Sequence, residues 1–259
     1  MYLVSEQPPG VSPSLKLFLT EPARGLVDLA ALPLAAPWLA IAPRGDGHGV
    51  LVLPGLLASD MSTAPLRRLL RWLGYDVHGW DLGRNVGPTE AVIGGLPQAL
   101  AAAVARSGGP VSVVGWSLGG IYAREMARER PADVRRVITL GSPFARNDPR
   151  QSRADGAYQR RSHQHVMDGR LPTREQVARP IDVPSTAVYS RHDGIVSWRN
   201  CVEEETERHD NIEVRCSHLG FGVDPATLWA IADRLAVPAG QRREFRPPPL
   251  LRPLYPGHR

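Results

Sequence analysis

Cysteine and lysine are both scarce in this chain. Only Cys201 and Cys216 occur among the 259 residues, too few for a disulfide-dense secreted scaffold or a four-cysteine zinc site. Lys16 is the single lysine, so arginine supplies the other 30 of the 31 basic residues. Acidic residues are interspersed with them, and no helix-turn-helix, zinc-finger or RNP pattern accompanies them. The net charge of +5 therefore does not predict a nucleic-acid partner.

Long apolar runs are also missing. The most apolar segment, residues 26–42, contains Asp28, Pro33 and Pro37 and falls short of the roughly 20 clean residues of a membrane-spanning helix. We expect a broken helical pair packed on the domain here, with a weak membrane-surface contact as the alternative. The first 14 residues have no basic start and are interrupted by prolines, which is unlike a signal peptide. We therefore expect a cytoplasmic protein, with peripheral attachment to a membrane left open.

From residue 49 onward, strand-like and helix-like runs alternate. Short apolar runs predict buried parallel strands at residues 49–54, 75–81, 111–116, 134–140, 184–191 and 211–216. An amphipathic run predicts a helix between Thr63 and Gly74. Helices are also expected at 88–106, at 118–129, around Glu203, Glu204 and Glu205, and at 224–235. This order predicts one α/β domain with a mostly parallel central sheet and helices on both faces.

The alternation divides the chain into four parts. Residues 1–48 form an N-terminal extension packed on the core, which comprises residues 49–143 and 183–236. Residues 144–182 interrupt the alternation and are too long for an ordinary connection, so they are predicted to be a cap at the carboxyl edge of the sheet. Residues 237–259 form a tail rich in proline and arginine. The apolar residues of this tail either dock on the body or remain loose: Leu250, Leu251, Leu254 and Tyr255.

A G-x-S-x-G pattern at residues 115–119 is the strongest local signal. It follows an apolar strand and opens a helix, the context of a nucleophile elbow. Such a turn strains the serine backbone, and Gly115 and Gly119 remove side chains that would collide across it. We expect the Ser117 hydroxyl to project above the sheet at a helix N-terminus, where developing negative charge is favoured. An ordinary capped loop is the alternative reading.

A serine nucleophile needs a base that a third group orients. Asp193 and His218 each follow a predicted strand, and the order Ser117, Asp193, His218 fits such a triad. His192 is the alternative base, although it should point away as the neighbour of Asp193. The remaining histidines, His209 among them, are expected mainly at surface positions.

Acyl transfer also needs donors for an oxyanion. The loop after the first strand continues from Pro54-Gly55 into Leu56, and the residue after the serine is Leu118. We assign the two donors to the backbone N–H groups of Leu56 and Leu118. A simple strand-ending turn is the alternative for the first loop.

These motifs together resemble the α/β-hydrolase superfamily over roughly residues 49–236. The similarity is greatest to bacterial serine esterases and lipases, and to GPI inositol-deacylase-like lipases. It is carried by PGLL at 54–57, GWSLGG at 115–120, TLGSPF at 139–144, RHDG at 191–194 and SHLG at 217–220. Many lipases have His-Gly in place of the Pro-Gly, and histidine in place of Trp116.

The resemblance implies the α/β-hydrolase fold with an inserted cap and a Ser-Asp-His triad that cleaves carboxylic esters through an acyl-enzyme. The substrate would be a small-molecule ester or a lipid. No cofactor is predicted, and no metal, since the Cys and His spacing matches no zinc pattern. An acyltransferase, an amide or peptide hydrolase and a non-catalytic binding module are the alternatives. No particular oligomeric state is predicted.

The composition of the predicted cap bears on the substrate. Eight arginines stand among few apolar residues, mainly Phe144, Tyr158, Val166, Met167, Leu171 and Val177. We therefore expect a largely polar cap that admits soluble or anionic-surfaced esters, or else arginines that merely solvate an exposed loop. Some bacterial lipases that resemble this chain have a disulfide near the triad histidine. A Cys201–Cys216 bridge is thus one alternative, and reduced thiols are the other.

Overall fold

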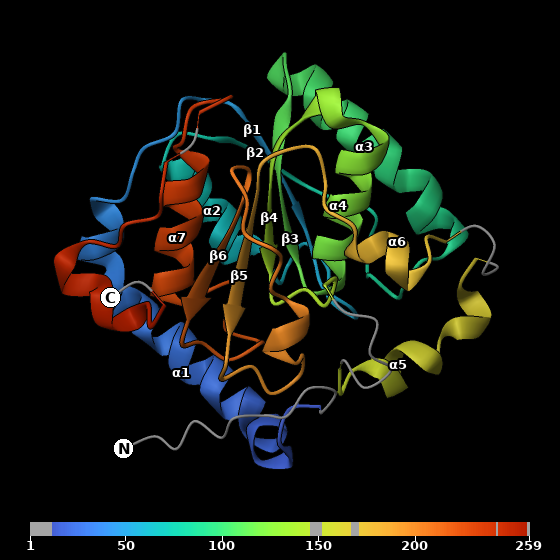
Figure 1. Cartoon of the computed structure of the whole chain (residues 1–259), viewed down its shortest axis with the longest axis horizontal. Coiled ribbons are helices and arrows are strands. Elements are labelled where there is room, and N and C mark those ends of the chain that lie inside the picture. The colour runs from blue at the N-terminus through green and yellow to red at the C-terminus, as the bar shows by residue number, and fades with distance from the viewer. Residues whose placement is uncertain (1–11, 146–151, 167–170, 242, 258–259) are drawn as a thin grey trace.

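The computed structural model describes residues 12–145, 152–166, 171–241 and 243–257. Predicted features at residues 1–11, Met167 and His258 lie outside these ranges. Within them, parallel strands form one sheet in the order β2-β1-β3-β4-β5-β6 (Figure 1). The strands are β1 (Gly49–Leu53), β2 (Asp76–Gly79), β3 (Val111–Trp116), β4 (Val134–Leu140), β5 (Ser185–Ser190) and β6 (His209–Val214). The predicted parallel sheet is confirmed.

Helices cover both faces of this sheet, as the sequence predicts. In Figure 1, α2 (Ala64–Trp72) and α7 (Pro225–Leu235) lie on one side, and α3 (Glu90–Ser107) and α4 (Leu118–Glu129) on the other. The remaining helices are α1 (Leu15–Ala40), α5 (Asp155–Gln159) and α6 (Arg174–Ala178), and the short 3₁₀ segments are η1 (Pro131–Asp133), η2 (Ser162–Gln164), η4 (Trp198–Asn200) and η5 (Pro249–Leu254). No helix of the described ranges is long and apolar enough to cross a membrane.

The residues of β1 alternate between two separate cores. Val50 and Val52 of β1 pack with residues of α2 and α7, whereas Leu51 and Leu53 pack with residues of α3 and α4. All four side chains are fully or almost fully buried. Because both faces of a parallel sheet are covered, its strands appear in the sequence as continuous apolar runs rather than as alternating ones.

The predicted broken helical pair at residues 26–42 is wrong. A single helix, α1, extends over 26 residues and has three prolines inside it: Pro22, Pro33 and Pro37. All three side chains are exposed, so each ring lies on the solvent side. Carbonyls that lose a partner to proline can there be satisfied by water, and the helix continues.

The helix predicted around Glu203, Glu204 and Glu205 is also absent, and this described segment is irregular. Side chains bind its backbone instead. The Asn211 amide accepts a hydrogen bond from Glu203 N–H and donates one to Glu203 C=O, at 3.0 and 2.9 Å. The Glu203 carboxylate pairs with the buried Arg124 at 2.8 Å, so the segment is held to α4.

Two expectations about the periphery are also resolved. His209, expected at the surface, is buried at the start of β6, with Nε2 2.9 Å from Ile181 C=O. The tail docks through Phe245 and Tyr255, and the Tyr255 hydroxyl donates to Ala226 C=O at 2.8 Å. Leu250, by contrast, is exposed.

The turn from β3 into α4 leaves no room for side chains on its glycines. A Cβ on Gly115 would lie 2.4 Å from both Gly119 O and Gly120 Cα, and one on Gly119 would lie 2.6 Å from Leu53 O. These obstacles are backbone atoms, which cannot rotate away. The expected need for glycine at 115 and 119 follows from this close approach of strand, turn and helix.

We expect Gly115→Ala to destabilise the protein by about 3 kcal/mol, because the new methyl group must displace backbone. Gly94→Ala is the matched control, since Gly94 lies in α3 and a Cβ there meets nothing within 4 Å. Alanine at this helical position should stabilise by about 1 kcal/mol. Urea unfolding of both variants measures the contrast, and equal stability of the two would contradict it.

Candidate active site

Ser117 occupies the turn between β3 and α4 in a strained backbone conformation. Its φ of 53° and ψ of −119° lie outside the region that serine ordinarily adopts. Its N–H donates to Leu140 C=O at 2.8 Å, which ties the turn to the end of β4. The residue is half-buried and lines a cavity. Ser142, the other serine nearby, is fully buried beneath the turn.

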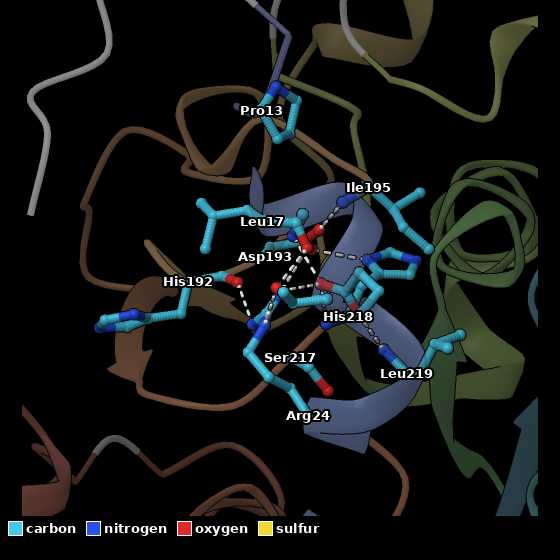
Figure 2. Close-up of polar contacts among 12 residues, drawn as sticks. Pro13, Leu17, Arg24, His192, Asp193, Ile195, Ser217, His218 and Leu219 are labelled. Atoms are coloured by element: carbon cyan, nitrogen blue, oxygen red, sulfur yellow. Dashed lines mark hydrogen bonds and ion pairs between the residues drawn. The ribbon is translucent and has the colours of Figure 1, made fainter. Parts of the chain in front are cut away.

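Asp193 and His218 are brought together from the loops after β5 and β6. The Asp193 Oδ2 lies 2.6 Å from His218 Nδ1, and both side chains are buried (Figure 2). The other oxygen, Oδ1, accepts from the N–H groups of Ile195 and Val196 at 2.8 and 2.7 Å. The His192 side chain points away from this pair. Asp193 is thus fully engaged, and Nε2 is the ring nitrogen of His218 that this pairing leaves available.

Gly141 links the serine to the acid–base pair. It follows Leu140, which accepts the Ser117 N–H, and has a φ of +54°. A Cβ at Gly141 would lie 3.1 Å from both Asp193 Oδ2 and His218 Nδ1. The turn that carries Ser117 and the Asp193–His218 pair therefore both pack against the segment Leu140–Gly141 at the end of β4.

The proposed oxyanion donors lie beside the serine. Leu56 and Leu118 line the same cavity as Ser117, and among described groups none accepts a hydrogen bond from either N–H. The buried Asn85 holds the first loop in place. Its side-chain amide donates to Pro54 C=O at 2.9 Å, and its backbone carbonyl accepts from Leu57 N–H at 2.6 Å. Asn85 lies in none of the sequence motifs and was not predicted.

A buried carboxylate on α1 binds the backbone of the loops that carry Asp193 and His218. The Glu21 Oε1 accepts from Gly194 N–H at 2.6 Å and from His218 N–H at 3.1 Å, and its Oε2 accepts from Leu219 N–H at 3.2 Å. Arg24 pairs with the same carboxylate at 2.8 Å and donates to His192 C=O at 2.6 Å (Figure 2). Glu21 thus links the loop that carries Asp193 to the loop that carries His218.

Further contacts support the histidine loop from two directions. Asp28, on α1, accepts from Ser217 N–H at 3.0 Å and from its hydroxyl at 2.6 Å. Trp116, where many lipases have histidine, donates its indole N–H to His218 C=O at 3.2 Å. Glu21, Arg24 and Asp28 were not predicted as site residues. Their spacing of i, i+3 and i+7 in an otherwise apolar segment was the available signal, because it places them on one helix face.

The environment of His218 favours its protonated form. Burial opposes the imidazolium, but the charge of Asp193, its hydrogen bond and the charge of Glu21 outweigh burial and raise the pKa of His218. Burial and the nearby Arg215 and Arg24 instead lower the pKa of His192. The pKa values of His218 and His192 therefore shift in opposite directions, and His218, whose pKa is raised, contacts the buried Asp193 carboxylate.

A cavity of about 560 Å³ opens beside Ser117, between α3, α4 and the predicted cap. Its wall is mostly apolar: Ile93, Leu96, Pro97, Ile121, Met126, Phe144, Leu171 and Val177 line it. Tyr122 also lines it, and its buried hydroxyl has no hydrogen-bond partner among the described residues. From segment 144–182, the apolar Phe144, Leu171 and Val177 line the cavity together with the polar Ser152, Asp155 and Gln159. The described part of the predicted cap therefore presents a surface of mixed polarity to the cavity.

The two cysteines are free and buried, so the disulfide alternative is not realised. Burial raises the pKa of both thiols well above the ordinary value, which keeps them protonated. No cluster of three His, Cys, Asp or Glu side chains within the described ranges could hold a metal ion.

Comparisons with known proteins bear on the fold. No family model matches the chain, and no curated protein matches its sequence. Solved structures do match. A monoacylglycerol lipase of Paleococcus ferrophilus is 18% identical with a TM-score of 0.51, and the match covers 75% of this chain and 96% of that one. Lipase B of Aspergillus fumigatus is 17% identical with a TM-score of 0.55, over 74% of this chain and 53% of that one.

A lipase-esterase related protein from Clostridium acetobutylicum is 13% identical, with a TM-score of 0.52 over 75% of this chain and 97% of that one. Identities this low speak to architecture alone. Together with the parallel sheet, the strained serine turn and the acid–base loops, they show that this chain has the α/β-hydrolase fold.

Proposed function

We propose that this protein is a serine hydrolase that cleaves carboxylic esters through an acyl-enzyme. One observation carries the proposal. A strained serine at the start of α4 packs, through Leu140 and Gly141, against a buried Asp193–His218 pair. An ordinary capped loop explains neither the strain nor the buried pair. The lipase and esterase names of the structural neighbours agree with this chemistry.

The chemistry proceeds in two half-reactions. His218 Nε2 takes the proton of the Ser117 hydroxyl as the oxygen attacks the ester carbonyl carbon. The carbonyl oxygen becomes an oxyanion and accepts from Leu56 N–H and Leu118 N–H. When the C–O bond to the alcohol breaks, His218 gives its proton to the leaving oxygen. Water then repeats the sequence on the acyl-enzyme, and the carboxylic acid leaves while Ser117 regains its proton.

Asp193 and Glu21 act on His218 in different ways. Asp193 holds the Nδ1–H tautomer and stabilises the imidazolium that forms during each proton transfer. Glu21 touches neither the substrate nor the reacting atoms. It is a positioning residue that holds the two loops in register and adds a second negative charge near the ring.

The cavity indicates the class of ester. Its volume falls within the range of small-molecule sites, and its apolar wall suits an acyl chain or another apolar group. We therefore revise the expected substrate from a soluble or anionic-surfaced ester to an ester with a substantial apolar part. The unpaired Tyr122 hydroxyl offers one hydrogen bond along that part.

Ser117→Ala should lower turnover of p-nitrophenyl esters by about 10⁴-fold or more, because the nucleophile is lost while the oxyanion donors remain. A fluorophosphonate should label the wild-type protein at Ser117 and leave this variant unlabelled. Ser162→Ala, at an exposed serine of η2, is the matched control and should retain both turnover and labelling. Labelling at Ser142, or near wild-type turnover in Ser117→Ala, would refute the mechanism.

The pH profile reports the charges around His218. The base must be neutral, so kcat/KM should rise with pH through one ionisation whose midpoint lies above 6.5, the ordinary histidine value. Asp193→Asn should lower kcat by about 10⁴-fold, since the amide favours the wrong tautomer. Glu21→Gln should lower kcat less and should move the acid limb to lower pH, because one charge that stabilises the imidazolium is removed.

Asp28→Asn is the control for Glu21. It also loses a contact from α1 to the histidine loop, yet its carboxylate is not among the groups that raise the pKa of His218. Its acid limb should therefore stay at the wild-type midpoint. If Glu21→Gln and Asp28→Asn lower kcat equally with unmoved limbs, Glu21 has only a structural role.

Segment 144–182 is proposed to set chain-length preference. Leu171→Ala should shift preference toward longer or bulkier acyl groups, because the smaller side chain in the wall enlarges the cavity. Replacing residues 146–179 with a short Gly/Ser linker should broaden the preference further. Gln164→Ala, at an exposed position of the same segment, is the control. Unchanged selectivity across an ester series in both altered proteins would show that the segment is a surface loop without a role in chain-length preference.

A further inference from the structure

The helix α1 differs from an ordinary surface helix in where its charged and its large apolar side chains lie. A surface helix normally packs its apolar stripe on the core and shows its charges to water. Here Glu21, Arg24 and Asp28 point inward and bind the loops after β5 and β6. Large apolar side chains face outward, with exposures of 67% at Leu26, 68% at Val27 and 82% at Leu34.

The outward face carries no charge over most of its length. Between residues 17 and 43, every exposed side chain is uncharged. The large exposed members are Phe18, Leu19, Leu26, Val27, Leu29, Leu34, Trp38 and Ile41. We call this set the α1 outer face. Exposed basic residues stand at its two ends, Lys16 and Arg44.

Two occupants of the α1 outer face can be compared by charge. In a pair of identical chains the same face of each copy would carry the exposed Lys16 and Arg44 at its ends, so basic residues would meet basic residues. An anionic bilayer instead presents headgroups of opposite charge. A single apolar helix face can also insert at the boundary between headgroups and acyl chains.

We propose that the α1 outer face docks this protein on the surface of an anionic lipid bilayer. Leu26, Leu34 and their neighbours enter the acyl boundary, and Trp38 lies near the headgroups, where indole rings are favoured. Lys16 and Arg44 pair with anionic headgroups at the two ends of the helix. In this arrangement α1 lies in the membrane surface and does not cross it, which agrees with the charged Glu21, Arg24 and Asp28 on its inner side.

The docked face borders the candidate active site. In Figure 1, α1 runs past the carboxyl ends of β5 and β6, and Glu21 binds the loops that leave them. Docking would therefore place the membrane along the edge of the sheet at which Ser117 lies. The inference does not rest on the proposed hydrolysis, because binding can be measured without turnover.

The test is sedimentation with sucrose-loaded vesicles, using the full chain with Ser117→Ala to exclude ester cleavage. Vesicles of phosphatidylcholine alone are compared with vesicles that also contain phosphatidylglycerol. We expect binding to both, with higher affinity for the anionic vesicles. Adding Leu26→Glu and Leu34→Glu should weaken binding by about 100-fold, roughly tenfold for each apolar side chain withdrawn.

Met61→Glu is the matched control, because Met61 is 79% exposed but lies in the loop between β1 and α2. It should bind vesicles as the parent protein does. Far-ultraviolet circular dichroism verifies that each variant is folded, as expected for substitutions at exposed positions. Sedimentation equilibrium without vesicles measures the oligomeric state.

Three results would overturn the proposal. The first is no binding of the parent protein to either vesicle. The second is equal loss of binding in Met61→Glu and in the α1 variant. The third is a vesicle-free dimer that Leu26→Glu with Leu34→Glu dissociates, which would assign the α1 outer face to a second copy of this chain.

Discussion

The close approach of strand, turn and helix at Ser117 is the constraint on which the rest of the site depends. Gly115 lies so near Gly119 and Gly120 that no side chain fits between them, and the serine takes a positive φ as a result. A residue held this way has few alternative positions, so its surroundings must be built to match. The order of the strands supplies this match, because β4 lies next to β3, β5 lies next to β4, and these parallel strands end at the same edge.

Loops at a sheet edge are ordinarily the more mobile part of such a fold, and here a helix from the other end of the sequence restrains them. Three N–H groups from two loops converge on one carboxylate of α1. Hydrogen bonds to a charged acceptor are stronger than neutral ones, and burial strengthens them further. The fixed geometry of Asp193 and His218 thus has a cause outside their own loops.

Residues that act through local pattern could be predicted from the sequence. The short pattern of Gly115, Ser117 and Gly119 predicts the turn, and apolar runs predict the strands. Asn85 and Glu21 could not be predicted in this way, because their importance lies in backbone groups far along the chain. Asn85 binds a loop some 30 positions earlier, and Glu21 binds N–H groups more than 170 positions later.

The errors in secondary structure have the same physical origin. Proline in residues 26–42 predicts an interrupted helix, but its effect depends on whether the ring faces solvent or the core, which sequence spacing alone does not state. The three consecutive glutamates predict a helix. Tertiary partners, chiefly Arg124 and Asn211, offered Glu203 better contacts than a helix would.

The position of α1 in the chain has a consequence for biogenesis. It leaves the ribosome well before the loops that bind Glu21, which contain residues 194 and 218. At about 5–20 residues per second, roughly 10–40 s separate the two events. Isolated helices are marginal in water, so during this interval α1 is an apolar segment without its polar contacts. Glu21 and Asp28 therefore acquire the backbone partners that hold α1 on the domain only when the loops after β5 and β6 have been made.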